Sequence, residues 1–176
     1  MRRDREVVLT AVRRSGGWAL KAASAEMRAD PEVAAAAVQQ SSLLLEHVAE
    51  SLQNDRKFVL PALKANGLAL QYCSEALKKD RACVLAAVRS SPQALGFAAP
   101  ELRNNREVVT IAVEKDGYAI QHASEKLKSN REVILTAIEE AGSGVVEFIP
   151  AAMQKDSLVA FAITQSKRSS RQPDEP

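Results

Sequence analysis

The chain has 176 residues, and its 24 basic and 22 acidic side chains give a formal net charge of +2. This balance is typical of a mixed, solvated surface rather than of a protein that binds polyanions through its overall charge. No stretch approaches the roughly 18 apolar residues of a membrane-spanning helix, and no apolar signal segment follows Met1. We therefore expect an intracellular, cytoplasmic protein without a signal peptide or transmembrane segment.

A unit of 25 residues recurs along the chain, and each unit begins with Asp or Asn. We number the places within the unit from 1, allowing one extra loop residue in units 1 and 6. The units begin at Asp4, Asp30, Asp55, Asp80, Asn105, Asn130 and, for a partial seventh unit, Asp156. Place 8 is always alanine: Ala11, Ala37, Ala62, Ala87, Ala112 and Ala137. Because such self-similarity is the signature of repeat architectures, we predict an all-α, solenoid-like array of short helical hairpins.

The first half of each unit predicts a helix. Asp or Asn at place 1 suits an N-cap, Pro31 suits a first helical position, and apolar residues at places 4, 5, 8 and 9 follow at helical spacing. We expect this helix to end near places 12 and 13 with a left-handed C-terminal cap. The residues there that tolerate this conformation are Gly16-Gly17, Asn66-Gly67, Asp116-Gly117 and Gly142.

The second half of each unit predicts a shorter, broken helix. Serine or proline interrupts it at places 20 and 21, as at Ser74 and Pro100. We expect a short helix over places 14 to 19, then a cap and one more turn that ends at place 23. Pro61 lies inside the first helix of its unit and predicts a local kink.

A second period, of two units, overlies the first. Odd units carry glycine at place 13 and serine at place 20, whereas even units carry Ala49, Ala99 or Pro150 at place 20. The repeating module is therefore predicted to be a pair of units with four helical segments, present three times.

Several stretches of the chain match one another and the pattern of a known family. They are DREVVLTAV, DRACVLAAV, NREVVTIAV and NREVILTAI, with the followers ALQYCSEALKKD and AIQHASEKLKSN. They resemble the domain of unknown function 4116, a tandem repeat of about 50 residues per module. The resemblance extends from Asp4 to about Lys155, and it implies an all-helical tandem array with no assigned chemistry or catalytic residues.

The array is predicted to occupy residues 1–165. Its last helical stretch, from Ser157 to about Gln165, would cover the C-terminal end of the core. Residues 166–176, SKRSSRQPDEP, are polar and contain proline, so we predict a disordered tail.

The residues that could carry chemistry do not form a catalytic pattern. Cys73 and Cys83 hold places that are apolar in other units, which predicts two buried thiols in a reducing compartment. Their number and spacing do not suit a zinc site, and His47 and His122 lie three units apart. The sequence has no nucleophile elbow, P-loop or metal motif. We expect no enzymatic activity, no cofactor and no bound metal.

Places 14 and 18 form an apolar stripe that points away from the face made by places 16, 19, 20 and 23. Place 14 holds Trp18, Leu43, Leu68 and Tyr118, and place 18 holds His47, Tyr72, Phe97, His122 and Phe148. One explanation is that helices in a solenoid are buried on two sides. The other is a concave groove lined by Trp18, Tyr72, Phe97, Tyr118 and His122.

Two sets of charged residues suggest further surfaces. Place 2 is arginine in every complete unit except the second, which predicts either salt bridges to the acids of places 1 and 3 or a row that binds phosphates. Places 10 and 11 change from Arg13-Arg14 in unit 1 to Glu139-Glu140 in unit 6. This gradient is either accidental or a docking edge for an acidic partner, through Arg13, Arg14 and the neighbouring Trp18.

The leading hypothesis is a non-catalytic interaction module that binds a protein or peptide along its repeat surface. A single-stranded RNA-binding array is an alternative, because helical repeats that read one base per unit exist. The near-neutral charge and the aromatic content of 4% count against it. A third possibility is an accessory segment of a longer enzyme.

Overall fold

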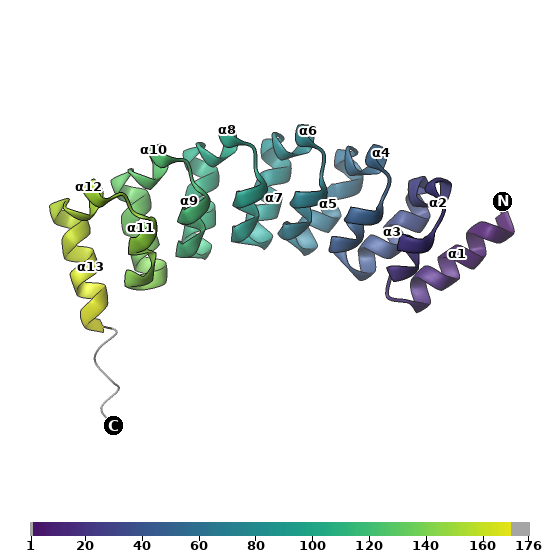
Figure 1. Cartoon of the computed structure of the whole chain (residues 1–176), viewed down its shortest axis with the longest axis horizontal. Helices are drawn as coiled ribbons and strands as arrows, with labels where there is room; N and C mark the ends of the chain where they lie inside the picture. Colours follow the sequence, from purple (N-terminus) through teal and green to yellow (C-terminus); the bar gives the residue numbers. More distant parts are fainter. Residues whose placement is uncertain (1, 170–176) are drawn as a thin grey trace, which may run out of the picture.

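The computed structural model describes the backbone of residues 2–169, and these residues form a single row of helical units without any strand. The row is gently arched, with α1 at one end and α13 at the other (Figure 1). Long helices contact the long helices of neighbouring units, and 3₁₀ helices contact neighbouring 3₁₀ helices. The prediction of an all-α array with a 25-residue period is confirmed.

Each complete unit contains three helical segments in a fixed order, so a pair of units has six segments rather than the predicted four. The long helices are α1 (Arg2–Arg14), α3 (Pro31–Gln40), α5 (Arg56–Ala65), α7 (Arg81–Ser90), α9 (Arg106–Lys115), α11 (Arg131–Ala141) and α13 (Ser157–Ser169). The 3₁₀ helices are η1 (Trp18–Ala22), η2 (Ser42–His47), η3 (Gly67–Tyr72), η4 (Pro92–Phe97), η5 (Gly117–His122) and η6 (Gly142–Phe148). The short α-helices are α2 (Ala25–Ala29), α4 (Glu50–Gln53), α6 (Glu75–Lys78), α8 (Pro100–Arg103), α10 (Glu125–Lys128) and α12 (Ala151–Gln154). The short helices follow one edge of the row (Figure 1).

The long helices begin as the sequence predicts. The carboxylate of Asp30 accepts hydrogen bonds from the backbone N–H groups of Glu32 and Val33, at 2.9 and 3.1 Å, and so caps α3. Inside the array, apolar residues at places 4, 5, 8 and 9 face the core, and the alanines of place 8 from Ala37 to Ala137 are buried. Pro61 lies inside α5 on its exposed side, and the helix continues through it.

The broken second helix is confirmed, but its first part is a 3₁₀ helix over places 13 to 18 rather than an α-helix over places 14 to 19. In η3, for example, Ala69 N–H donates to the carbonyl of Asn66 three residues earlier, at 3.1 Å. The chain is then extended, and an α-helical turn follows over places 21 to 24. The hydroxyls of Ser74 and Ser124 at place 20 cap these turns, as predicted.

The prediction of left-handed caps is wrong for two of the four glycine sites. Among the described residues, positive φ occurs at Gly16, Gly17 and Gly142. Asn66 ends α5 in an extended conformation, with φ −151°, and its side chain accepts a hydrogen bond from Leu68 N–H at the start of η3. Gly67 is required instead by a close approach, because a Cβ there would overlap the carbonyl oxygen of Ala87 in the next unit.

The two-unit period reflects two kinds of interface. Between an odd unit and the following even unit, the glycine at place 13 lies on the backbone of the alanine at place 8. This close contact occurs at Gly17 with Ala37, Gly67 with Ala87, and Gly117 with Ala137. Between an even unit and the following odd unit, the serine at place 20 donates a hydrogen bond to an asparagine of the preceding unit. These bonds join Ser74 to Asn54 and Ser124 to Asn104, both at 2.7 Å.

A ladder of backbone hydrogen bonds also joins successive units. In each case the N–H of place 20 donates to the carbonyl of place 24 in the preceding unit. The bonds run from Ala49 to Arg28, Ser74 to Gln53, Ala99 to Lys78 and Ser124 to Arg103, at 2.9 to 3.3 Å. In unit 6 this place is Pro150, which has no N–H, so the ladder does not extend to that unit.

At the C-terminal end, α13 continues to Ser169 and therefore passes the predicted boundary at residue 165. The remainder of the predicted tail, residues 170–176, lies outside the described residues.

Over the part of the chain that the structure covers, no helix has the length and apolar character needed to cross a membrane.

The close packing at place 8 gives a stability prediction with an internal control. Ala87 is fully buried, whereas Ala11, at the same place of unit 1, is exposed. Ala87→Leu should overpack the interface and lower the free energy of unfolding by about 1–3 kcal/mol. Ala11→Leu should change it by less than about 0.5 kcal/mol. Equal losses for the two variants in chemical denaturation would contradict this assignment of the interface.

Candidate interaction surface

The 3₁₀ helices bring a side chain at place 14 of one unit against place 18 of the next at three unit boundaries. The rings of Trp18 and His47 have centroids 6.4 Å apart, and those of Tyr118 and Phe148 are also 6.4 Å apart in an edge-to-face arrangement. In both pairs, place 14 of one unit contacts place 18 of the next. We call this row of side chains the η stripe. Its members are Trp18, Leu43, Leu68, Gln93 and Tyr118 at place 14, and His47, Tyr72, Phe97, His122 and Phe148 at place 18.

The η stripe is partly packed and partly open to solvent. Trp18 is 62% exposed and Tyr118 is 40% exposed, and Phe97 is also exposed. Tyr72 and His122 are half-buried. Tyr72 and His122 therefore fit the explanation that helices of the array are buried on two sides, whereas Trp18, Phe97 and Tyr118 retain free aromatic surface. The groove lined by these residues stays a prediction.

A polar network interrupts the apolar row in the middle of the array. The Gln93 amide donates to the carboxylate of Asp116 at 2.6 Å, and its oxygen lies 2.9 Å from Nε2 of His122. Because the amide oxygen can only accept, Nε2 of His122 carries the proton in this arrangement. Burial, with smaller contributions from the positive charges of Arg103 and Lys128, lowers the pKa of His122 below its ordinary value.

Polar side chains at place 17 accompany the η stripe. The amides of Gln71 and Gln121 each donate to the carbonyl of the place-14 residue in the same 3₁₀ helix, at 3.1 Å. Glu46 and Glu147 hold this place in other units and are exposed. Burial and the nearby Glu46 carboxylate raise the pKa of Tyr72. The stripe thus offers aromatic surface beside amides and carboxylates.

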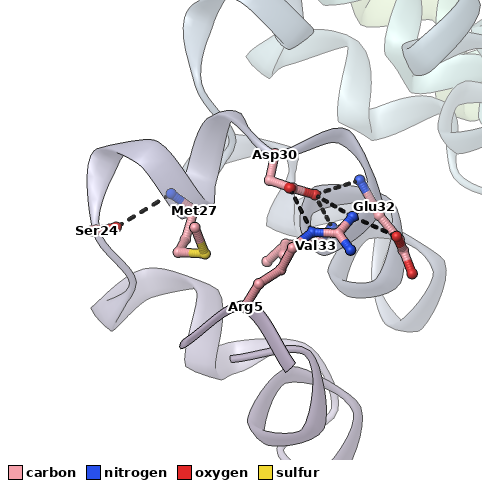
Figure 2. Close-up of polar contacts among 6 residues, drawn as sticks. All are labelled: Arg5, Ser24, Met27, Asp30, Glu32 and Val33. Atoms are coloured by element: carbon pink, nitrogen blue, oxygen red, sulfur yellow. Dashed lines mark hydrogen bonds and ion pairs between the residues drawn. The ribbon is translucent and has the colours of Figure 1, made fainter. Parts of the chain in front are cut away.

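The arginines of place 2 pair with the acids of the following unit. Arg5 contacts the carboxylates of both Asp30 and Glu32, and Asp30 at the same time caps α3 (Figure 2). The equivalent pairs farther along are Arg56 with Asp80, Arg81 with Glu107, Arg106 with Glu132, and Arg131 with Asp156. Pro31 breaks the series in unit 2. The arrangement favours the salt-bridge ladder over a row of arginines that binds phosphates.

The two arginines that end α1 are exposed but lie in different surroundings. Arg14 lines a shallow depression with Val7, Thr10 and Ala11 at the N-terminal end of the row. Arg13 lines another depression, beside Glu32 and Gln39 of the next unit. The exposed edge predicted for places 10 and 11 is present in most units, but Arg13 and Arg14 do not share one depression.

The two thiols are buried, as predicted. Neither forms a disulfide, and burial is the main cause that raises the pKa of Cys73 to about 12 and that of Cys83 to about 11. Within residues 4–168, no group of three or more His, Cys, Asp or Glu side chains is placed to hold a metal ion.

The amides of the η stripe are the part of this surface that the sequence reasoning missed. Gln93 holds a place that is apolar or aromatic in four other units, and glutamine recurs at place 17 as Gln71 and Gln121. That recurrence could have indicated a role for Gln71 and Gln121, whose bonds to the place-14 carbonyls are local. The role of Gln93 depends on hydrogen bonds to Asp116 and His122, which lie more than twenty positions away.

Comparison with protein families identifies the repeat. The family model described as Domain of unknown function (DUF4116) matches four overlapping segments, residues 4–53, 30–75, 55–103 and 105–154. Most of these matches span about two units, in agreement with the two kinds of interface in the structure. No curated protein and no solved structure matches the chain.

The buried thiols should be unreactive in the folded protein. Because the thiolate is the reactive form and burial raises the pKa of Cys73 and Cys83, Ellman's reagent at mildly alkaline pH should modify the native protein slowly. Unfolding in guanidinium chloride should release both thiols at once. Rapid modification of either cysteine in the native protein would mean that its site opens far more readily than the structure indicates.

His122 should make the protein less stable as the pH falls. Its pKa in the folded protein lies below the ordinary value of 6.5, so the unfolded chain binds more protons between those two values. The contribution of His122 to the free energy of unfolding is therefore fully present above the pKa of the unfolded chain. It decreases as the pH falls from that pKa to the pKa of the folded protein.

We expect His122→Gln to reduce the loss of unfolding free energy between about pH 7.5 and about pH 5. His47→Gln, at the same place of unit 2, retains His122 and should retain the part of the pH dependence that His122 causes. Parallel pH profiles for wild type and His122→Gln would contradict this role.

Proposed function

Because the chain belongs to the family of tandem helical repeats described as Domain of unknown function (DUF4116), we propose that it acts as an array. In this proposal it is a non-catalytic module that binds a segment of another protein along the η stripe. The observation that carries the proposal is the row of partly exposed aromatic side chains that continues across unit boundaries, including Trp18, Phe97 and Tyr118.

The chemistry of the η stripe suits an extended peptide. Aromatic side chains such as Trp18 and Tyr118 provide large contact areas at low entropic cost and are enriched among binding hot spots. The amides of Gln71 and Gln121 can hydrogen-bond a peptide backbone. Exposed carboxylates at Glu46 in η2 and Glu147 in η6 favour basic side chains in the bound segment.

The arrangement of charges supports a protein segment over single-stranded RNA. Arginines that could contact phosphates, such as Arg81 and Arg106, are paired with carboxylates of the next unit. Carboxylates beside the η stripe would also repel a phosphate backbone. RNA binding by stacking on Trp18 and Tyr118 remains the alternative that the experiment must distinguish.

The test is selection of peptides from a random display library on the immobilised protein, followed by anisotropy measurements with the enriched peptides. Trp18→Ala and Tyr118→Ala should each weaken binding by about tenfold or more, as expected for aromatic anchors. Phe161→Ala is a matched control, because Phe161 is also an aromatic residue that is 62% exposed, but it lies on α13.

Three outcomes would overturn the proposal. One is enrichment of no peptide over an unrelated control protein. Another is unchanged affinity in both Trp18→Ala and Tyr118→Ala. The third is tight binding of a labelled oligouridine, lost in Trp18→Ala and steeply weakened by salt, which would favour the RNA alternative.

A further inference from the structure

The N-terminal end of the array exposes a surface that other units bury. In unit 1, Val7 at place 4 is 67% exposed and Ala11 at place 8 is also exposed, whereas Leu9 at place 6 and Val12 at place 9 are buried. In units 2 and 4 to 6, the residues of places 4 and 8 are nearly inaccessible. Places 4 and 8 therefore face the preceding unit, and in unit 1 no described residues cover them.

The C-terminal end exposes the opposite set of places. In α13, Val159 at place 4 and Ile163 at place 8 are buried against unit 6, whereas Phe161 at place 6 is 62% exposed and Thr164 at place 9 is also exposed. Places 6 and 9 therefore face the following unit. The long helices at the two ends of the described array therefore present the two opposite sides of the helix-to-helix contact that recurs between its units. The described part of unit 7 has no 3₁₀ helix, so the Gly–Ala contact and the backbone ladder have no counterpart at that end.

The internal interfaces show how these two halves fit. The depression between α5 and α7 is lined by Leu60 and Lys64 at places 6 and 10 of the first helix and by Ala82 and Ala86 at places 3 and 7 of the second. The same depression at the N-terminal end has only its second wall, which includes Glu6 and Thr10 at places 3 and 7.

One polar contact indicates the direction of docking. Lys115, at place 11 of unit 5, donates from its ammonium group to the backbone carbonyl of Arg89 near the end of the preceding long helix, at 2.6 Å. Arg14 holds place 11 in unit 1 and lies in the open depression at the end of the row. A cation at this position is suited to the C-terminal end of a helix that lies parallel to α1.

We propose that a second copy of the chain docks head to tail on this surface, with its α13 parallel to α1. Phe161 of the second copy would lie on Val7 and Ala11, as Ala35 at place 6 of unit 2 lines one depression together with Phe58 and Ala62 at places 4 and 8 of unit 3. This goes beyond the proposed function, because it uses the two ends of the row and leaves the η stripe open.

The side chains at the two ends determine the affinity of this association and the size of the assembly that it forms. Serine replaces arginine at place 2 of unit 7, as Ser157, and threonine replaces an aliphatic residue at place 9, as Thr164. Glu6 would therefore gain no arginine partner of the kind that Glu107 has. The contact is weaker than an internal interface, so association depends on concentration. A head-to-tail contact leaves one free half at each end and can add further copies.

The test is sedimentation velocity of the full chain over a series of concentrations. The weight-average mass of the wild type should rise with concentration, whereas Val7→Glu and Phe161→Glu should each remain monomeric. Both substitutions are at exposed positions, and circular dichroism will confirm that the variants fold. A mixture of the two variants is decisive, because each retains the half that the other has lost. The mixture should form a dimer and nothing larger.

Other results would overturn the proposal. A wild type that stays monomeric at every concentration would mean that second copies do not fit these ends. Association that is lost in Val7→Glu but unchanged in Phe161→Glu would indicate contact between two N-terminal ends. A mixture that remains monomeric would show that the two surfaces do not bind each other. Control variants Leu43→Glu and Trp18→Ala, on the η stripe, should associate as the wild type does.

Discussion

The close contact between the start of a 3₁₀ helix and the backbone of the next long helix determines how the units stack. At Gly67 and Gly117 a side chain would overlap the carbonyl of the alanine opposite, so the two backbones approach as closely as they can. This contact explains the alanine at place 8 of the even units, Ala37, Ala87 and Ala137, because a larger side chain there would separate the units. Once two units are at this distance, the N–H of place 20 reaches the carbonyl of place 24 in the preceding unit. The arginine of place 2 then also reaches a carboxylate of the following unit, as Arg5 reaches Asp30.

These contacts also make each unit dependent on its neighbours. A 3₁₀ helix of six residues has few internal hydrogen bonds and limited stability alone. In the odd units it is held by the Gly–Ala contact on one side and by the backbone ladder on the other, as at Gly67 and Ser74. Stability should therefore be a sum of unit and interface contributions. None of the described residues covers the outer face of unit 1, so Val7 is exposed where Val108 is fully buried.

Local sequence signals predicted the parts of the fold that depend on neighbouring residues. The N-caps, the long helices and the break at place 20 followed from the side chains that form them. The meaning of Gly67 and Gly117 could not be predicted in the same way, because glycine permits both positive φ and close backbone approach. The partner that decides between them, Ala87 or Ala137, lies twenty residues farther along the chain. The same limit applied to the η stripe: its aromatic residues were recognisable by type, whereas the role of Gln93 depends on Asp116 and His122.

The variation among units separates residues that hold the array together from residues that are free to serve another role. Every complete unit has alanine at place 8, and from unit 2 to unit 6 this alanine is buried between units. Place 14 is instead tryptophan, leucine, leucine, glutamine, tyrosine and glycine in units 1 to 6. If packing alone determined this place, the repeated geometry would select similar side chains, as it does at place 8. Trp18 and Tyr118 are exposed where stacking of the units does not require an aromatic ring. Their presence on an otherwise aromatic-poor protein is the strongest internal argument that the η stripe, rather than the salt-bridged edge, is a binding surface.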